Sequence, residues 1–325
     1  MTMHLFVVAL LWSVRLAPVG VVDALQRVDV RRTDEPRERV HDPSADVRLV
    51  ARQTVSGFGA GQGIAHRDGL PYFYGDVRGE SYDLDSPEDD YGYIREYRLT
   101  GNGDGPGVEF TGREIRLTKN GVNVAPHPTG LTFHPEFGCF MGDTVNQTGL
   151  IFHLDFDRAL ADGTLDNAIL NITADDVAAN GARPEFVRFG GRWLVATSDY
   201  GDEDNEIRLY DPEVLATSAR VSRPGALVAS FPATPFVQTL HWVEALDTLV
   251  LVQNQLPGRL YRLTLARFQD GALVLDPPID IEGLDDELEG LFVGPVSGGV
   301  APIVMLSAYS NDNVTFASLR LPGER

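Results

Sequence analysis

Glu289-Gly290-Leu291, preceded by Asp286-Glu287-Leu288, opens the last of five copies of one short pattern in this 325-residue chain. Each copy has a small or polar opening and an apolar step, then a second apolar run that ends in Asp, Asn or Ser, then a third run rich in Tyr, Arg and Leu. The copies open at Gln62-Gly63-Ile64, Thr129-Gly130-Leu131, Glu185-Phe186-Val187, Gln238-Thr239-Leu240 and Glu289-Gly290-Leu291. Their third residues stand at positions 64, 131, 187, 240 and 291, so the interval falls from 67 to 51 residues. A repeat of this length, built from short alternating strands, is typical of β-propeller blades.

The repeat predicts an all-β fold, a five-bladed β-propeller with four strands in each blade. The fifth copy is one strand short, because only three strand-like runs follow position 288. Val47 to Arg52 alternates like a strand and precedes the first copy, so we expect it to pair outside the last run, at 315–321. This pairing would close the ring and protect the open edges of the sheets. Six blades are the alternative, if the long first interval contains a degenerate blade.

Composition limits the possible functions. The 33 glycines and 20 prolines suit a chain rich in turns. A net charge of −20 argues against a nucleic-acid partner, because binding phosphates requires surplus Lys and Arg. The one cysteine, Cys139, excludes an internal disulfide and a cysteine-built zinc site, and its apolar neighbours predict a core position.

The N-terminal segment predicts export. Residues 1–24 resemble a secretory signal: Leu5 to Val14 is apolar but too short to span a bilayer, and Val22-Asp23-Ala24 fits the small-residue pattern before a cleavage site. The segment before Leu5 lacks Lys and Arg, in contrast to most such signals. Residues 25–46 are charged and interrupted by proline, which is typical of a linker. We therefore expect a secreted or periplasmic propeller spanning 47–325, without a stable membrane span.

Polar side chains should converge at one mouth of the propeller. Inner strands begin at the same face at which the turns between second and third strands open, so two sets of residues meet there. The first set opens the blades and contains Gln62, Thr129, Glu185, Gln238 and Glu289. The second set ends the second strands and contains Asp76, Asp143, Asp199, Asn254 and Asn311 with Asp312. Because none is Lys or Arg and Ca²⁺ takes six to eight oxygen ligands, the pattern predicts a calcium site, with ordered channel water as the alternative.

Known propellers show similar features. The Glu289-Gly290-Leu291 opening resembles the Glu-Gly start of an inner strand in the calcium-dependent SMP-30/gluconolactonase and strictosidine-synthase-like propellers. With Asp286-Glu287-Leu288 it also resembles the opening of SdiA-regulated and esterase-like phytase propellers. The gluconolactonase resemblance implies that Glu289 is a metal ligand, with Asn254 and Asp199 as the nearest matches to the other ligands. Those families generally have six blades, and their fuller signatures are absent here. The five openings are also similar in kind to the calcium-holding pore of five-bladed calcium-activated nucleotidases.

Candidate catalytic residues follow from the same mouth. His127, before Pro128, and His241, on the first strand of blade four, are possible bases or ligands. Asp143 and Asp199 could complete a metal shell or position water. The sequence does not single out a nucleophile, so two functions stay open. The first is calcium-dependent hydrolysis of a small ester, lactone or phosphoester, with Glu289 and Glu185 as metal ligands. The second is a non-catalytic propeller with structural calcium that binds a carbohydrate or a protein at the mouth.

Overall fold

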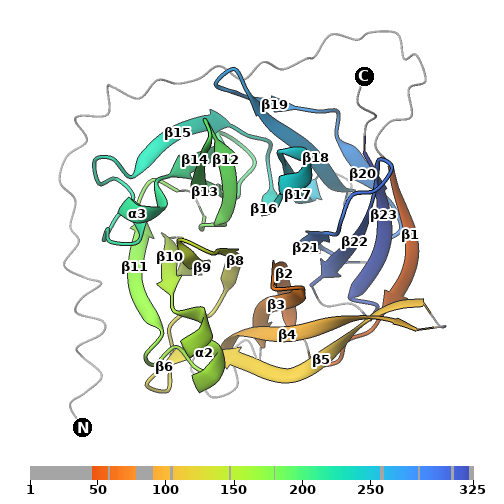
Figure 1. Ribbon diagram of the computed structural model, residues 1–325, viewed down its shortest axis with the longest axis horizontal. Helices are drawn as coiled ribbons and strands as arrows, with labels where there is room; N and C mark the ends of the chain where they lie inside the picture. Colours follow the sequence, from red (N-terminus) through yellow and green to blue (C-terminus); the bar gives the residue numbers. More distant parts are fainter. Residues whose placement is uncertain are drawn as a thin grey trace.

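A computed structural model describes residues 46–57, 59–77, 91–102, 105–145, 148–178, 180–256, 260–284, 286–308 and 311–321. In this part of the chain, five antiparallel sheets stand around a central channel, and a separate two-stranded sheet joins β6 (Thr118–Lys119) to β7 (Val122–Asn123) (Figure 1). The five-bladed propeller predicted from the repeat is confirmed, and the described residues contain no sixth blade.

In the first four blades the strands follow the order of the sequence from the channel outwards. Blade one contains β2 (Ala60–Arg67), β3 (Leu70–Val77), β4 (Tyr91–Asn102) and β5 (Gly105–Arg116). Blade two contains β8 (Pro128–His134), β9 (Gly138–Val145), β10 (Thr148–Leu154) and β11 (Ile169–Asp175). Blade three contains β12 (Glu185–Phe189), β13 (Arg192–Ser198), β14 (Glu206–Tyr210) and β15 (Leu227–Pro232). Blade four contains β16 (Val237–Val243), β17 (Thr248–Leu256) and β18 (Leu260–Gln269), which pairs with both β19 (Ala272–Leu275) and β20 (Ile279–Ile281).

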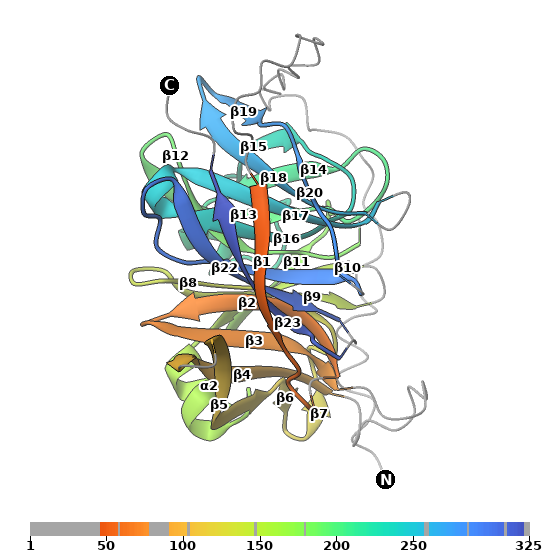
Figure 2. The same ribbon diagram turned by 90° about the vertical axis from the view of Figure 1, so that its right-hand side faces the viewer.

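The fifth blade joins the two ends of the described chain. It contains β21 (Leu288–Val293), β22 (Val300–Ser307), β23 (Val314–Arg320) and, outermost, β1 (Asp46–Gln53). β1 runs antiparallel to β23, with Asp46 opposite Arg320 and Gln53 opposite Val314, and Figure 2 shows it along the outer edge of that blade. Closure by an N-terminal strand is therefore confirmed, and the strand begins at Asp46, one residue before the predicted start.

The outer strands are the least regularly patterned part of the fold. In blade one, β5 covers Gly105–Arg116 and forms a long hairpin with β4. This hairpin and the β6–β7 pair account for part of the long first interval. In blade four, β19 has one buried side chain. Most β5 side chains are exposed or half-buried, so its hydrophobic alternation is too weak to locate the strand from sequence.

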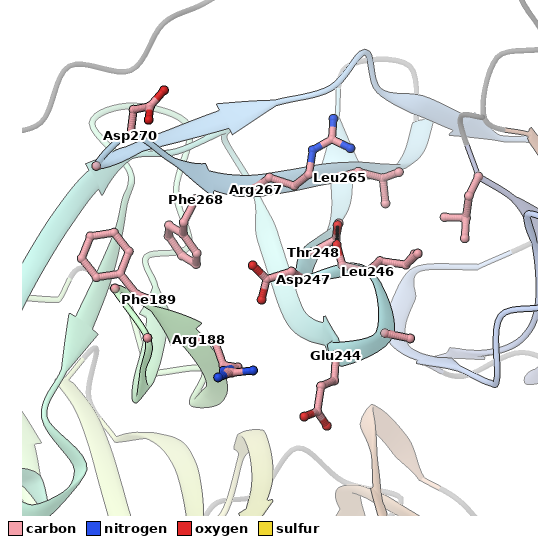
Figure 3. Close-up of a pocket in the computed structure, with 15 residues that line it drawn as sticks. Arg188, Phe189, Glu244, Leu246, Asp247, Thr248, Leu265, Arg267, Phe268 and Asp270 are labelled. Atoms are coloured by element: carbon pink, nitrogen blue, oxygen red, sulfur yellow. Dashed lines mark hydrogen bonds between the residues drawn. The ribbon is translucent and has the colours of Figure 1, made fainter. Parts of the chain in front are cut away.

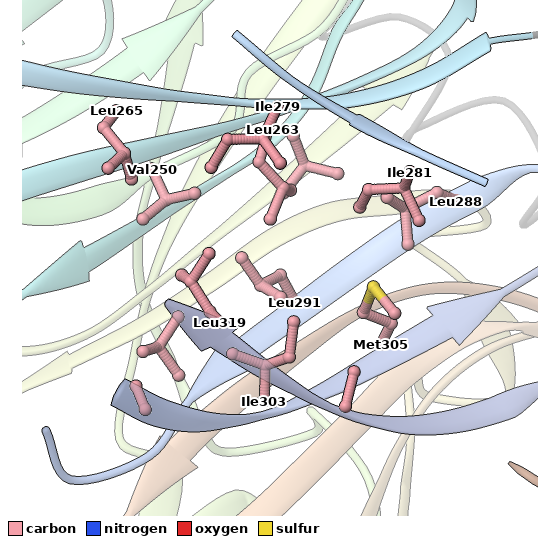
Figure 4. Close-up of a cluster of buried hydrophobic side chains, with 14 of the residues drawn as sticks. Val250, Leu263, Leu265, Ile279, Ile281, Leu288, Leu291, Ile303, Met305 and Leu319 are labelled. Atoms are coloured by element: carbon pink, nitrogen blue, oxygen red, sulfur yellow. The ribbon is translucent and has the colours of Figure 1, made fainter. Parts of the chain in front are cut away.

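The hydrophobic core lies between neighbouring blades. Figure 4 shows the cluster in which Val250 and Leu263 of blade four meet Leu291, Ile303 and Met305 of blade five. Cys139 is buried in the corresponding cluster between blades one and two, as predicted. Within the described residues, three short helices lie in the connections: α2 (Phe156–Asp162), α3 (Pro212–Leu215) and the 3₁₀-helix η1 (Glu244–Leu246). No helix within the described ranges is long and apolar enough to cross a membrane.

Gln53 connects β1, the strand that closes the ring, to β5 of blade one through two hydrogen bonds. Its Nε2 donates to the carbonyl of Val108 at 2.8 Å, and its Oε1 accepts from the amide of Val108 at 2.8 Å. We expect Gln53→Ala to lower the free energy of unfolding by about 1–3 kcal/mol, because both main-chain groups of Val108 lose their partner. Urea unfolding measures this change. Val50→Ala, at a β1 side chain that is 61% exposed, is the control, and equal midpoints for the two variants would contradict this role of Gln53.

Candidate functional site

Four inner strands carry a β-bulge where the repeat opens. The pairing register shifts between Gly61 and Gly63, Pro128 and Gly130, Val237 and Thr239, and Leu288 and Gly290. The extra residues are Gln62, Thr129, Gln238 and Glu289, and all four are buried. They line one cavity of about 220 Å³ at the end of the channel where the inner strands begin, which we call the funnel. A bulge re-aims a side chain relative to the regular strand, so it explains why these four meet.

Blade three departs from this arrangement. β12 pairs with β13 without a register shift, and Glu185 lines a different cavity at the opposite end of the channel. Arg183, two residues before β12, lines the funnel instead. The expectation that Glu185 shares the funnel with the other four openings is therefore corrected. The funnel also contains an arginine, which the sequence pattern did not suggest.

Gln238 connects three blades inside the funnel. Its Nε2 donates to Gln62 Oε1 at 3.2 Å and to Glu289 Oε2. Burial raises the pKa of Glu289 well above its usual range, and the adjacent Glu287 carboxylate, with which it shares a hydrogen bond, raises it further. Glu287 also accepts a hydrogen bond from Gln255 Nε2 at 2.8 Å. Two carboxylates this close require a shared proton or a cation between them.

Arg183 and Tyr200 form the opposite side of the funnel. Arg183 Nε donates to the carbonyl of Gln238 at 2.8 Å, and the guanidinium lies 4.9 Å from the ring centre of Tyr200. The hydroxyl of Tyr200 donates to Asn254 Oδ1 at 2.8 Å. Burial lowers the pKa of Arg183 to about 10, which leaves the guanidinium charged at neutral pH. A carbonyl or carboxylate oxygen in the funnel would therefore find a fixed positive charge.

His127 lines the funnel and is oriented by a carboxylate from blade one. Its Nδ1 lies 2.8 Å from Asp76 Oδ2, and Asp76 is buried. A carboxylate at Nδ1 favours the tautomer that carries its proton there, which leaves Nε2 as an acceptor. The backbone amide of His127 donates to Asp143 Oδ1 at 2.8 Å, and Asp143 does not line the funnel. Burial raises the pKa of Asp143 to about 6.

Two other candidates lie away from the funnel. Asp199 is bound by the buried guanidinium of Arg208, through Nη2 to Oδ1 at 2.6 Å and Nη1 to Oδ2 at 2.8 Å. His241 lies with Glu185 at the opposite end of the channel, where its Nε2 accepts from the amide of Val293 at 3.2 Å. Asn254 lines the funnel, as predicted. Asn311 and Asp312 do not.

The funnel has donors suited to calcium but not to zinc. No group of three or more His, Cys, Asp or Glu side chains in the described part of the chain is arranged to hold a metal. The funnel offers instead the carboxylates of Glu287 and Glu289 with amide and hydroxyl oxygens from Gln62, Thr129 and Asn254. Calcium accepts such oxygens in flexible geometry, whereas zinc prefers nitrogen and sulfur.

A larger cavity of about 930 Å³ opens between the strand turns of blades three and four. Figure 3 shows Asp247 near its middle, with Arg188, Arg267 and Phe268 around it. None of the side chains singled out from the sequence lines this cavity. The smaller funnel gathers Gln62, His127, Thr129, Gln238, Asn254 and Glu289, and it is therefore the candidate site.

Comparison with known proteins adds no argument to the fold and the site described above. No family model and no curated protein matches the sequence. Similar solved structures include hydrazine synthase of Kuenenia stuttgartiensis, with a TM-score of 0.42 and 10% identity over 78% of this chain and 57% of that chain. They also include the Pan2 WD40 domain of Neurospora crassa, with a TM-score of 0.36 and 10% identity over 83% and 91% of the two chains. A provisionally named gluconolactonase has a TM-score of 0.40 and 12% identity over 86% and 92%. The alignment covers less than two thirds of the hydrazine synthase chain, and similarity at this level carries no argument about activity.

Proposed function

We propose that the funnel is the active site of a calcium-dependent hydrolase of a small ester, lactone or phosphoester. One observation carries the proposal: the His127–Asp76 pair and the Glu287–Glu289 carboxylates meet at one small cavity. A base with an orienting carboxylate is the arrangement that activates water or a hydroxyl, and paired carboxylates with neutral oxygens are a fitting calcium shell. The volume of about 220 Å³ limits the part of a substrate that can enter to a small group.

The residues divide the chemistry as follows. Glu287 and Glu289 would hold the metal, with oxygens of Asn254 and Gln62, and bound calcium supplies Lewis-acid polarisation of the scissile group. His127 Nε2 removes a proton from the attacking water while Asp76 holds the imidazole and stabilises its charged form. The water oxygen adds to the ester carbon, and the guanidinium of Arg183 stabilises the negative charge that develops on the carbonyl oxygen. The C–O bond then breaks, and His127 returns the proton to the leaving alkoxide.

A non-catalytic function is favoured by one different observation. Gln62, Gln238 and Glu289 already form a hydrogen-bonded set across three blades, and such amide groups suit the hydroxyls of a carbohydrate. In that case calcium would act as a structural plug. Hydrolysis assays separate the two functions, because only the first requires turnover.

Export is part of the proposal and rests on residues 1–24 and 25–46, which lie almost entirely outside the described residues. We infer that the mature protein is secreted or periplasmic and begins near position 25. Intact mass and N-terminal sequencing of protein purified from the medium or the periplasm test this. An unprocessed chain confined to the cytoplasm would contradict it.

The metal site is tested by thermal unfolding after chelation and after calcium is added back. We expect wild type to bind stoichiometric calcium and to gain about 2–3 kcal/mol at a hundredfold excess over the Kd. Glu289→Gln should lose this gain, because it removes the central ligand charge. Glu109→Gln, at an exposed residue of blade one, is the matched control. Equal calcium shifts in wild type and Glu289→Gln would rule out the metal site.

Activity is tested with nitrophenyl esters, lactones and phosphoesters. We expect His127→Asn to lower kcat about a hundredfold and to keep the calcium shift, because it removes the base without touching a ligand. Wild-type turnover in His127→Asn would reject the mechanism. A calcium shift without any turnover in the wild type would favour the binding function.

A further inference from the structure

The channel has a second cavity at the end where the inner strands finish. This far cavity measures about 470 Å³ and is lined by aromatic rings, among them Phe133, His134, Phe186, Trp193, Trp242 and Phe292. The carboxylates of Glu185 and Glu244 also line it, and none of its described lining residues is Lys or Arg. An aromatic enclosure with negative charge and no positive charge is suited to a cation.

The side chain of Tyr74 lies between the inner strands of blades one and four. It is buried, and its hydroxyl lies so close to Gly63 on the inner strand of blade one that a Cβ there would collide with it. The same hydroxyl hydrogen-bonds Thr239 on the inner strand of blade four. The far cavity and the funnel have no lining residue in common, so the far cavity is a site of its own.

Glu185 is held in place but its charge has no counterpart. Its Oε1 accepts from the amide of Trp242 at 3.2 Å, and the hydroxyl of Thr132 also hydrogen-bonds it. Among the described residues, no Arg, Lys or His forms an ion pair with Glu185. Burial raises the pKa of this carboxyl to about 8, because the charged form is costly where no opposite charge is close. A ligand cation would remove this cost.

The histidines around the far cavity do not supply the missing charge. His241 Nε2 accepts from the amide of Val293, so this nitrogen carries no proton, and burial lowers the pKa of His241 to about 4. Burial also lowers the pKa of His66 and His134. The nearest arginines lie beside rings of the wall, Arg67 at 5.8 Å from Phe133 and Arg188 at 5.8 Å from Trp193, but both line other cavities.

Trp242 contributes to the wall of the far cavity. It lines the cavity and is 8% exposed, and its ring packs against Phe268 in the core of blades three and four.

We propose that the far cavity binds a small organic ammonium ion. The ammonium group lies among the rings of Trp193, Phe186 and Phe292 and against Glu185. Quaternary ammonium groups suit such enclosures because they bind aromatic faces strongly and lose little hydration.

Isothermal titration of the full-length protein with choline tests this. The matched probe is 3,3-dimethyl-1-butanol, which has the same shape without the charge. We expect choline to bind at least about tenfold more tightly than this alcohol. Glu185→Gln, which keeps the shape of the side chain, should weaken choline binding about tenfold or more, and Trp193→Leu should also weaken it.

The controls separate this inference from the proposed hydrolase. Glu289→Gln should bind choline like wild type, and Glu185→Gln should keep the calcium shift of the funnel. Equal binding of choline and the neutral alcohol, unchanged choline binding in Glu185→Gln, or no binding of choline at millimolar concentration would each overturn the proposal. Binding of neutral sugars at this end in place of choline would overturn it as well.

Discussion

Replacing Asp199 with alanine should lower the free energy of unfolding by about 3–5 kcal/mol, because the buried guanidinium of Arg208 loses both of its short hydrogen bonds to a carboxylate and keeps only a longer contact with Glu206, at 3.8 Å. The two side chains are 6% and 3% exposed and meet through two hydrogen bonds of 2.6 and 2.8 Å. Arg208 Nε also donates to the hydroxyl of Tyr210 at 3.1 Å, and that hydroxyl donates to Asp175 Oδ1 at 3.3 Å. Removing Asp199 therefore disturbs a buried polar network, and urea unfolding should show it.

The control for Asp199→Ala is an exposed ion pair. Arg262 and Asp280 meet at 2.7 Å with half-exposed side chains, so Asp280→Ala should cost no more than about 1 kcal/mol. A double replacement, Asp199→Leu with Arg208→Met, should recover much of the loss, because it removes both charges of the pair. If Asp199→Ala instead unfolds like wild type but loses turnover, Asp199 belongs to the chemistry, as the sequence suggested.

The fold could be predicted because propeller strands bury their side chains in a regular alternation. The same short pattern recurs five times, and the missing fourth strand of the last blade pointed directly to the segment at 47–52. The strands β5 and β19 could not be located from the sequence, because most of their side chains are exposed or half-buried and such positions tolerate many residue types.

The candidate site could be predicted only in part, because register decides which side chain faces the channel. Four inner strands have a bulge, and each bulge directs one side chain into the funnel: Gln62, Thr129, Gln238 or Glu289. β12 has no bulge, and Glu185 lies at the opposite end of the channel. A slip of one residue reverses a strand's faces, and hydrophobic alternation does not reveal it. Pairs such as His127 and Asp76 come from segments far apart in the sequence, so the sequence does not reveal that the two side chains are in contact. Arg183 lies two residues before Glu185, so placing the opening of blade three at position 183 identifies the residue that lines the funnel.

Glu185→Gln should remove much of the pH dependence of stability between about pH 4.5 and 8. Burial raises the pKa of this carboxyl from 4.5 to about 8 in the folded protein. In that interval the folded state keeps a proton that the unfolded state has released, so stability falls as the pH rises, by up to about 5 kcal/mol. The stability that protonated Glu185 contributes is fully present below the pKa of the unfolded state. It is lost as the pH rises through the pKa of the folded state.

Glutamine has the same shape and no charge, so the variant and the wild type should unfold alike at about pH 3.5, where Glu185 is largely protonated in both states. At about pH 8 or above the variant should be more stable by a few kcal/mol, because it has no charge to bury. Asp143→Asn is the matched comparison: since burial raises the pKa of Asp143 only to about 6, its gain should be complete by about that pH. Urea unfolding across the pH range measures both gains. If Glu185→Gln gains nothing between pH 6 and 8, the carboxylate is paired in solution, and the cost that a cation in the far cavity would remove does not exist.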